Sequence, residues 1–317
     1  MQWRVDEIRD QWGMRGECLV AEPLAPLTTW RVGGSADLLV RPVDLEDVHA
    51  LFNFLRHNRL PWVVLGGGSN VLIADSGVRG VVIQLTDMNY IIPCGECQLR
   101  VGAGCSINHL VAETVRQGYA GFESLAGIPG TVGAAVAGNA GALGQQVGDC
   151  VHSGLVAENA AVERWLHEEF AFGYRSSAIT TEYVVLEVTM KCQRGQPEQL
   201  RQRVKLARQH RWQAQPVVGA NAGSVFKNPP RQSAWKLIAE SGLQGKSVGD
   251  AQVSKQHANF IVNCGKASAM DIVALVSKVQ QVVAEKTGFK LEPEIKFIGD
   301  FGEAAVQVAL MQVNGRV

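Results

Sequence analysis

The segment Pro61-Trp62-Val63-Val64-Leu65 runs directly into Gly66-Gly67-Gly68-Ser69-Asn70. The first half has the length and apolar, β-branched character of a buried strand. Three successive glycines then allow a tight turn in which several backbone N–H groups point toward one place and hold phosphate oxygens. The spacing is not G-x-G-x-x-G and the lysine of a P-loop is missing, so Rossmann and Walker loops are excluded. A phosphate-binding turn of another type and a plain flexible turn both remain open.

Composition indicates a folded protein with two domains, or three. The chain has 317 residues, of which 46% are hydrophobic and 19% are charged, so a substantial core is available. Thirty Lys and Arg residues balance thirty Asp and Glu residues. This neutral balance argues against nucleic acid or an anionic membrane as the main partner, although it allows a local basic pocket for phosphates.

The chain shows no secretory or membrane signal. Charges occupy the N-terminus where a signal peptide needs an apolar stretch, and the most apolar run, residues 124–144, contains Pro129 and Asn139. Seven scattered cysteines form no disulfide framework. Cys94 and Cys97 match C-x-x-C but lie between two strand-like segments, which favours a hairpin turn over a zinc or redox pair. We expect a cytoplasmic protein without a metal site.

Hydrophobic periodicity predicts alternating helices and strands. Ser106 and Gly118 are a helix cap and stop, and Ser268 with Asp271 is a capping signature. Helices are expected at 44–58, after Ser106 as far as Gly118, at 198–212, 233–241 and 269–286. Strands are expected at 37–42, 61–65, 71–73, 80–83, 98–101, 183–188, 260–263 and 290–298.

A second glycine-rich run lies between residues 121 and 148. Gly127, Gly130 and Gly133 recur at three-residue steps, and Gly138-Asn139 follows. Small residues at this density leave room for a flat or extended ligand. They equally suit tight packing of backbone on backbone.

The segment Ala222-Gly223-Ser224-Val225-Phe226-Lys227-Asn228-Pro229 presents a hydroxyl and an ammonium group on a constrained loop. Gly223 permits a tight turn and Pro229 blocks a regular continuation. A hydroxyl beside a cation can give a proton to a carbanion or act as a nucleophile. A plain turn with a hydrogen-bonded serine is the alternative.

Two further charged residues are candidates. Arg175 follows Tyr174 and precedes two serines, and Glu294 follows Pro293. A guanidinium can clamp a carboxylate or stabilise an enolate. Taken alone, the local sequence favours a surface salt bridge for Arg175 and a solvated carboxylate for Glu294.

Two short matches point to another enzyme class. Residues 224–227 match S-x-x-K and residues 286–288 match K-T-G, both found in penicillin-binding serine enzymes. The third motif, S-D-N, is absent. The serine of those enzymes opens a helix, which Gly223 and Pro229 disfavour here.

Taken in order, the motifs resemble the UDP-N-acetylenolpyruvylglucosamine reductases (the MurB family), from about residue 27 to residue 299. The resemblance covers Thr28-Thr29-Trp30-Arg31-Val32-Gly33-Gly34, residues 65–72, Gly127-Ile128-Pro129-Gly130-Thr131-Val132-Gly133, Phe172-Gly173-Tyr174-Arg175-Ser176-Ser177, residues 222–229, His257-Ala258-Asn259-Phe260-Ile261-Val262-Asn263 and Leu291-Glu292-Pro293-Glu294. No single motif is decisive, but all of them in one order are a specific signal.

The resemblance implies an α+β fold. A two-lobed FAD-binding region of the vanillyl-alcohol-oxidase (PCMH) type would occupy residues 27–195, with lobes at about 27–90 and 91–195. An α+β substrate-binding domain would occupy residues 205–299. Residues 1–26 would be an N-terminal extension and residues 300–317 a C-terminal tail.

The resemblance also implies a reaction. NADPH would reduce bound FAD, which would pass the hydride to UDP-N-acetylglucosamine enolpyruvate and give UDP-N-acetylmuramate for peptidoglycan. The implied catalytic residues are Arg175, Ser224 as the proton donor, and Glu294. The implied FAD-binding residues are Gly66, Gly67, Gly68, Ser69, Asn70, Gly127, Ile128, Pro129, Gly130, Thr131, Gly133, Gly138 and Asn139. The implied substrate-binding residues are Tyr174, Lys227, Asn228 and His257. The enzyme would be a monomer whose partners are a sugar nucleotide and NADPH.

One position departs from the family. Leu143 stands where a tyrosine is usual, so a phenol contact is missing. The short distance from Arg175 to Ser224 resembles the family's second type, which lacks an extra tyrosine-bearing loop. Three alternatives stay open: another FAD oxidoreductase on this fold, a serine acyl-transferase using Ser224 and Lys227, and a flavin or nucleotide binder without activity.

Overall fold

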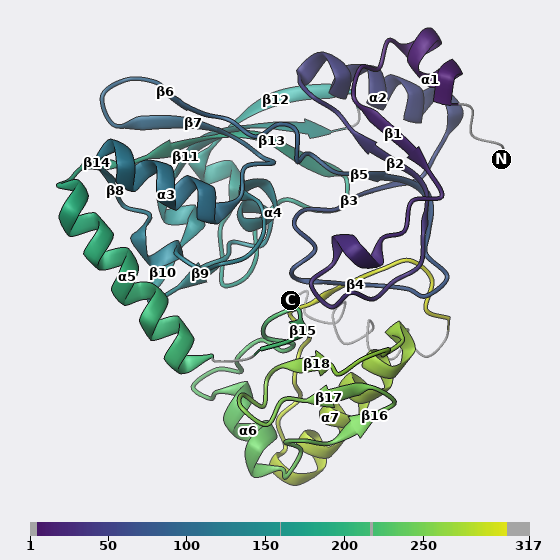
Figure 1. The fold of residues 1–317 in the computed structure, drawn as a ribbon, viewed down its shortest axis with the longest axis vertical. Helices are drawn as coiled ribbons and strands as arrows, with labels where there is room; N and C mark the ends of the chain where they lie inside the picture. The colour runs from purple at the N-terminus through teal and green to yellow at the C-terminus, as the bar shows by residue number, and fades with distance from the viewer. Residues whose placement is uncertain (1–4, 159, 216–217, 303–317) are drawn as a thin grey trace. The chain divides into compact units, whose positions relative to one another are not determined.

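The chain passes repeatedly between two separately packed units (Figure 1). The computed structural model describes residues 5–158, 160–215 and 218–302. The first unit contains the residues up to Val20, then Leu38–Gly67 and Gly80–Gln213; the second contains Ala21–Asp37, Gly68–Arg79 and the residues from Ala214 on. Most of the predicted tail, residues 303–317, lies outside the described residues.

Two β-sheets form the framework of the first unit. One is fully antiparallel and has the order β12 (Ala161–Leu166), β11 (Val151–Glu158), β13 (Tyr183–Lys191), β7 (Gln98–Gly102) and β6 (Ile91–Pro93). The other has the order β1 (Glu17–Val20), β2 (Ala36–Arg41), β5 (Val78–Ile83) and β3 (Trp62–Val64), in which β3 and β5 are parallel. Short antiparallel pairs join β8 (Tyr119–Ala120) to β14 (Gln193–Arg194) and β9 (Gly141–Ala142) to β10 (Gln145–Gln146).

The described residues of the first unit form five α-helices. They are α1 (Val5–Trp12), α2 (Leu45–Asn58), α3 (Ile107–Gln117), α4 (Val132–Ala137) and α5 (Pro197–Ala214). Ser106 Oγ accepts the His109 N–H at the start of α3, and Gly118 ends that helix with φ +73°. The sequence predicted both residues in these positions.

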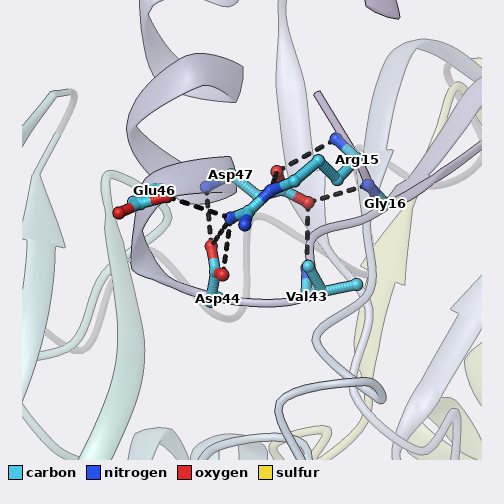
Figure 2. A network of polar contacts seen from close by, with 6 residues as sticks. All are labelled: Arg15, Gly16, Val43, Asp44, Glu46 and Asp47. Carbon is cyan, nitrogen blue, oxygen red and sulfur yellow. Dashed lines mark hydrogen bonds and ion pairs between the residues drawn. The ribbon is translucent and has the colours of Figure 1, made fainter. Parts of the chain in front are cut away.

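The start of α2 is held by a buried carboxylate (Figure 2). Asp47 Oδ2 accepts the N–H groups of Gly16 at 2.8 Å and Val43 at 3.2 Å, while Oδ1 accepts the Arg15 N–H at 3.0 Å. Burial alone would raise the pKa of Asp47, but these hydrogen bonds and one from the Arg15 guanidinium lower it below its ordinary value. The network fastens the segment after α1 to the helix.

The second unit is an antiparallel sheet covered by helices. Its strand order is β15 (Ala220–Asn221), β18 (Ile261–Asn263), β17 (Ala251–Val253) and β16 (Ser247–Val248), and its helices are α6 (Ala234–Glu240) and α7 (Ala269–Thr287). The predicted capping signature is present, because Ser268 Oγ accepts the Asp271 N–H at 3.0 Å. The strand β4 (Val71–Ile73) pairs in parallel with β19 (Lys296–Ile298).

Early residues complete the core of the second unit. Trp30 is fully buried beside residues of α6 and α7, and its Nε1 donates to Ile261 O at 2.8 Å. Asp75 accepts the N–H groups of Ala269 and Met270 at 2.9 and 3.2 Å, at the start of α7. The segments 21–37 and 68–79 are therefore structural parts of a unit whose other residues come much later in the chain.

Some elements differ from the expectation. The sequence did not predict β11, β12 or α4, and the strand expected at 290–298 is limited to Lys296–Ile298. The hairpin expected around Cys94 and Cys97 is present as β6 and β7. Among the described residues, no helix has the length and apolar character needed to cross a membrane.

Candidate functional site

The glycine turn after β3 packs against the second glycine segment. A Cβ added at Gly67 would lie 2.7 Å from Gly130 Cα, and one at Gly66 would lie 2.6 Å from Ala134 Cβ. Both distances are well below van der Waals contact, so only glycine allows the two backbones to approach this closely. The structure thus brings together two of the predicted cofactor-binding stretches, which are far apart in the sequence.

The N–H groups of this turn fit an anionic group. Among the described residues, the N–H groups of Gly66, Gly67 and Gly68 donate no hydrogen bond, whereas Gly68 O accepts the Thr29 N–H at 3.0 Å. Gly66 O likewise accepts Gln84 Nε2 at 3.5 Å. Successive backbone donors without a protein acceptor are suited to phosphate oxygens. The turn therefore fits the diphosphate of the dinucleotide that the sequence predicted.

The second glycine segment is fixed by an asparagine of α3. Asn108 Oδ1 accepts the Gly127 N–H at 3.0 Å, and Asn108 Nδ2 donates to Ile128 O at 3.4 Å. Thr131 is buried at the N-cap of α4, and a Cβ at Gly133 would lie 2.8 Å from Ala103 Cβ. The remaining predicted residues of this stretch are exposed or half-buried: Pro129, Gly130 and Gly138.

A loop of residues 172–177, here called the guanidinium loop, docks on the end of this segment. Asn139 is buried, and its Nδ2 donates to Gly173 O at 2.8 Å. Arg175 Nη2 donates to Gly141 O at 3.0 Å. The structure therefore places Arg175 beside the predicted cofactor segment within the first unit. The Asn139 amide serves the backbone of these loops, because its Oδ1 also accepts the Gly148 N–H at 3.0 Å.

Arg175 has an unusual backbone conformation. Its φ is +54°, a left-handed value that is uncommon for residues other than glycine and is concentrated at functional sites. The ring of Tyr174 lies beside it, with its centroid 5.6 Å from Arg175 Cζ. Tyr174 itself is exposed, so a ligand can reach the phenol.

A second arginine, which the sequence analysis missed, joins Arg175. Arg211, in the last turn of α5, packs so closely on Gly127 that an added Cβ there would lie 3.2 Å from Arg211 Cδ. Burial, and then the positive charge of Arg175, lower the pKa of Arg211 below its ordinary value. Two guanidinium groups near each other beside a glycine segment suit an anionic ligand. Nothing in the local sequence separates Arg211 from the other basic residues of α5.

In the second unit, residues 222–229, here called the serine loop, present Ser224. Gly223 has φ +74°, as the sequence predicted for a tight turn. The backbone after Ser224 is held by Asn259, whose Oδ1 accepts the Phe226 N–H at 3.0 Å and whose Nδ2 donates to Phe226 O at 2.8 Å. Ser224 is half-buried, and among the described residues its hydroxyl makes no hydrogen bond. The hydroxyl is therefore available to a ligand.

Glu294 lies next to the serine loop. The Glu294 N–H donates to Val225 O at 2.7 Å, and the Lys227 N–H donates to Glu292 O at 2.9 Å. These bonds pair the serine loop with residues 292–294 as two short antiparallel segments, with Phe226 opposite Pro293. Ser224 and Glu294, which are distant in the sequence, thus lie on two paired segments, in which Val225 is the residue opposite Glu294.

The ammonium of Lys227 is bound to a carboxylate. Lys227 Nζ lies 2.6 Å from Glu292 Oε1, and both side chains are partly exposed. In an S-x-x-K acyl-transferase the lysine must contact the serine hydroxyl that it activates. The observed partner is Glu292, which disfavours that alternative.

The other predicted residues of the second unit make contacts with Glu294, with the start of α6 or with neighbouring aromatic rings. Asn70 Nδ2 donates to Glu294 O at 3.1 Å, and Ser69 precedes it at the end of the glycine turn. Asn228 Oδ1 accepts the Ala234 N–H at 3.0 Å at the start of α6. His257 packs with its ring 4.8 Å from that of Phe260, and burial lowers the pKa of His257 below its ordinary value.

Each unit therefore carries one group of predicted site residues. The first unit joins Gly66, Gly67 and the segment 127–139 to Arg175. The second joins Asn70, Ser224, Lys227 and Glu294. Chemically, the first group offers backbone N–H donors and guanidinium groups for anions, and the second offers a hydroxyl and a carboxylic acid on two paired segments.

Two protein-family models match the chain. One, described as "FAD binding domain", covers residues 36–160. The other, described as "UDP-N-acetylenolpyruvoylglucosamine reductase, C-terminal domain", covers residues 215–298. The expected α+β class with an FAD-binding region is thereby confirmed.

Curated and solved relatives match over nearly the whole chain. The UDP-N-acetylenolpyruvoylglucosamine reductase of Syntrophotalea carbinolica is 41% identical over 280 residues, 88% of this chain and 94% of that protein. The enzyme of the same name from Geobacter sulfurreducens is 42% identical over 287 residues, 90% and 96% of the two chains. The crystal structure of UDP-N-acetylenolpyruvylglucosamine reductase (MurB) from Thermus caldophilus has a TM-score of 0.77 and 37% identity, and covers 90% of this chain and 100% of that one.

Proposed function

The chain belongs to the UDP-N-acetylenolpyruvoylglucosamine reductase family, and we propose that it reduces UDP-N-acetylglucosamine enolpyruvate to UDP-N-acetylmuramate for peptidoglycan synthesis. FAD, when bound, supplies the hydride chemistry, accepting a hydride from NADPH and delivering it to the enolpyruvyl double bond. The protein residues bind, orient and provide the charge and the proton that the reaction requires.

The glycine turn and the second glycine segment are proposed to hold FAD. The N–H groups of Gly66, Gly67 and Gly68 would bind its diphosphate, with Ser69 and Asn70 at the end of the turn. Residues 127–133, with Gly138 and Asn139, would shape the rest of the site. This proposal is supported by the free N–H groups of the turn and by the close approach of Gly67 to Gly130.

Arg175, Ser224 and Glu294 are proposed as the catalytic residues. Hydride addition to an enolpyruvyl group places negative charge beside a carboxylate, and a guanidinium or a carboxylic acid stabilises that charge. The adjacent carbon then needs one proton, which the Ser224 hydroxyl would give. Tyr174, Lys227, Asn228 and His257 would contact the sugar nucleotide.

One observation carries the assignment in the second unit. The backbone of Glu294 bonds directly to Val225 at 2.7 Å, so the carboxylic acid and the proton donor share one rigid pair of segments. A hydroxyl that makes no hydrogen bond to the described residues would be free to contact the substrate carbon. Asn259, which bonds to both backbone groups of Phe226, fixes this geometry.

The substitution Ser224→Ala tests the proton donor. We expect FAD to be reduced by NADPH at the wild-type rate, while its reoxidation by the enolpyruvyl substrate falls by at least about 10²-fold, because general acids contribute 10²–10⁴-fold. Stopped-flow absorbance at the flavin band separates the two half-reactions. Ser233→Ala, nearby in the same unit and without a side-chain cap bond, is the matched control. Unchanged reoxidation in Ser224→Ala would show that another group supplies the proton.

We further propose that the enzyme acts in the cytoplasm as a monomer. All seven cysteines are free thiols, as expected in a reducing compartment. Light scattering during size-exclusion chromatography would test the monomer: a mass near 34.2 kDa is expected for one chain, and twice that mass would contradict it.

A further inference from the structure

The tip of the β6–β7 hairpin carries two thiols that the proposed reaction does not use. Cys94 and Cys97 flank Gly95 and Glu96, and Gly95 has φ +83° in the turn. The Cys94 N–H donates to Gln98 O at 2.9 Å, which closes the hairpin. A third thiol, Cys192, follows the last residue of β13.

Cys192 lies directly opposite Cys97. In the ladder between β13 and β7, Lys191 pairs with Gln98, so the next pair outward is Cys192 with Cys97. The Cys192 N–H donates to Cys97 O at 3.0 Å, which extends the ladder by this pair. Opposite residues joined by such hydrogen bonds have Cα atoms about 5.5 Å apart, within the about 4.4–6.8 Å that a disulfide spans.

The two side chains are on the same face of the sheet. Leu99 and Met190, two residues further into the ladder and paired with each other, are both fully buried on the core face. Because side chains alternate along a strand, Cys97 and Cys192 lie on that same face. Cys192 is buried and Cys97 is half-buried, and both pack with the core of the first unit.

Cys94 has a different environment. Cys94 is opposite Gln98, the residue after Cys97. Because successive side chains of a strand point to opposite faces, Cys94 lies on the other face of the hairpin from Cys97, together with Arg100. The described residues contain no group of three or more Cys, His, Asp or Glu that could hold a metal ion. The C-x-x-C motif is thus split between two faces, and the pair suited to bonding is Cys97 with Cys192.

We propose that Cys97 and Cys192 form a reversible disulfide when the enzyme meets a peroxide. The half-exposed Cys97 thiolate attacks the peroxide, breaks its O–O bond and becomes a sulfenic acid, releasing one water or alcohol. The Cys192 sulfur then attacks the Cys97 sulfur and displaces the hydroxyl as water, with loss of the thiol proton. Two thiols lose two electrons in total, and the peroxide gains them.

The surroundings assign the order of these steps. Burial raises the pKa of Cys192 to about 11, so this residue is mainly a thiol at neutral pH and a slow first nucleophile. Cys97 is more accessible and is the first to react. The pair is the last of the ladder between β13 and β7 and lies beside the hairpin turn. The disulfide would join the hairpin to the segment that leads through β14 into α5.

The experiment treats purified, FAD-loaded enzyme with hydrogen peroxide, blocks free thiols with N-ethylmaleimide and maps peptides by mass spectrometry without reduction. We expect a peptide pair linked through Cys97 and Cys192 that dithiothreitol separates. After unfolding, thiol titration should fall from the seven cysteines of the sequence by two. A dominant Cys94–Cys97 link, a link through Cys264 between chains, or oxidised cysteines without any disulfide would overturn the proposal.

Three variants sharpen the test. After peroxide treatment, Cys97→Ser and Cys192→Ala should each form no disulfide, so their thiol count should not fall by two. Cys94→Ser, three residues from Cys97 on the other face, should lose two titratable thiols as the wild type does. Because the peptide map of the wild-type enzyme needs no variant, misfolding of Cys192→Ala would leave the proposal testable. Failure of this proposal would leave the reductase assignment untouched, since no residue is shared between the two.

Discussion

The buried side-chain amide of Asn259 bonds to both the N–H and the carbonyl of Phe226, while the backbone carbonyl oxygen of Asn259 accepts the Val225 N–H at 2.8 Å. No other described side chain makes a hydrogen bond to the backbone between Ser224 and Phe226. The position of the proposed proton donor, Ser224, therefore depends on Asn259, which takes no direct part in the proposed reaction.

Replacing Asn259 should separate positioning from proton donation. Asn259→Ala leaves two buried groups of Phe226 without partners, so we expect a loss of about 2–4 kcal/mol in the free energy of unfolding. The rate of substrate reduction should fall about 10²-fold because the hydroxyl is misplaced, while NADPH still reduces FAD. Urea unfolding and stopped-flow absorbance measure the two effects.

Asn263→Ala is the matched control. Its side-chain amide makes three hydrogen bonds, to Trp30 O, Gly265 N–H and Ala267 N–H, each at 3.0 Å, against two for the side-chain amide of Asn259. It should lose comparable stability but keep its rate of substrate reduction. Equal loss of rate in both variants would mean that Asn259 acts only through general stability.

Gly67→Ala tests the close approach of the two glycine segments. The added methyl group would lie 2.7 Å from Gly130 Cα, so the segments must separate. Overpacking of this kind costs about 1–3 kcal/mol, which corresponds to FAD binding about ten- to hundredfold more weakly. Titration of the apoenzyme with FAD gives the Kd.

Gly195→Ala provides the comparison for Gly67→Ala. Its methyl group would meet only side-chain carbons of Leu200 and Ala120, at 3.1–3.3 Å. We expect its FAD Kd to match that of the wild type. Wild-type affinity in Gly67→Ala would contradict the proposed role of the glycine turn.

At this scale the sequence identified residues by their chemistry and missed those that act through backbone contacts. Ser224 and Glu294 are distinctive within their motifs, and the structure places them on two paired segments. The sequence did not indicate a role for Asn259 or Asn108, because a side-chain amide that bonds to backbone groups leaves no local sequence pattern. Arg211 escaped because α5 carries several other basic residues, and only packing on Gly127 separates it from them.

Among the elements, α2 depends most clearly on a single carboxylate. Asp47→Asn replaces one acceptor oxygen by an NH₂ group that faces backbone donors. We expect the free energy of unfolding at pH 7 to fall by about 2–3 kcal/mol. Because the folded-state pKa of Asp47 is below its ordinary value, its contribution is complete above about pH 4 and is lost as pH falls through that lower pKa.

The measurement is urea unfolding of both proteins between pH 7 and pH 3. The difference between wild type and Asp47→Asn should be constant near neutral pH and shrink toward acid. Glu46→Gln is the control, because its exposed pair with Arg15 at 3.4 Å should contribute less than about 0.5 kcal/mol. A difference that does not change with pH would contradict the role of the charge.

Most helices could be predicted because their signals are local. Ser106, Gly118, Ser268 and Asp271 mark ends that the structure reproduces. The strands β11 and β12 could not, since Ser153 and Gly154 interrupt the apolar pattern of β11, which instead gains its stability from two pairing partners. The short helix α4 lies in a glycine-rich run whose composition disfavours helix, and packing overrides that preference.

At the scale of the whole molecule, the second unit is built from three separated pieces of chain. The predicted division into residues 27–195 and 205–299 stays a prediction, because it follows motif order rather than contacts. No local pattern reveals that Trp30 or Asp75 belongs with α7; only the folded structure does so.

A fragment of residues 205–299 should therefore fail to fold on its own. It lacks Trp30, Val32, Leu72 and Ala74, which are buried in the core of the second unit, and it lacks the strand that pairs with β19. Removal of one buried tryptophan alone typically costs about 3–5 kcal/mol. We expect no cooperative thermal transition by circular dichroism, and strong binding of a dye for exposed apolar surface.

The full chain is the comparison for the fragment, and it should melt cooperatively under the same conditions. Addition of a separate peptide of residues 21–37 should not restore the fragment, since β4 and Asp75 would still be missing. A sharp transition in the fragment would show that the early segments are dispensable.

The threading of the chain matters most while the protein is being made. Residues 21–37 and 68–79 leave the ribosome before their partners from Ala214 onward exist. At about 5–20 residues per second, the translation of residues 80–213 takes on the order of ten seconds, during which Trp30 and Leu72 lack the partners that bury them. During that interval the nascent polypeptide exposes hydrophobic side chains that are buried only after the residues from Ala214 onward have been made. A chaperone that binds these side chains would raise the yield of the mature enzyme.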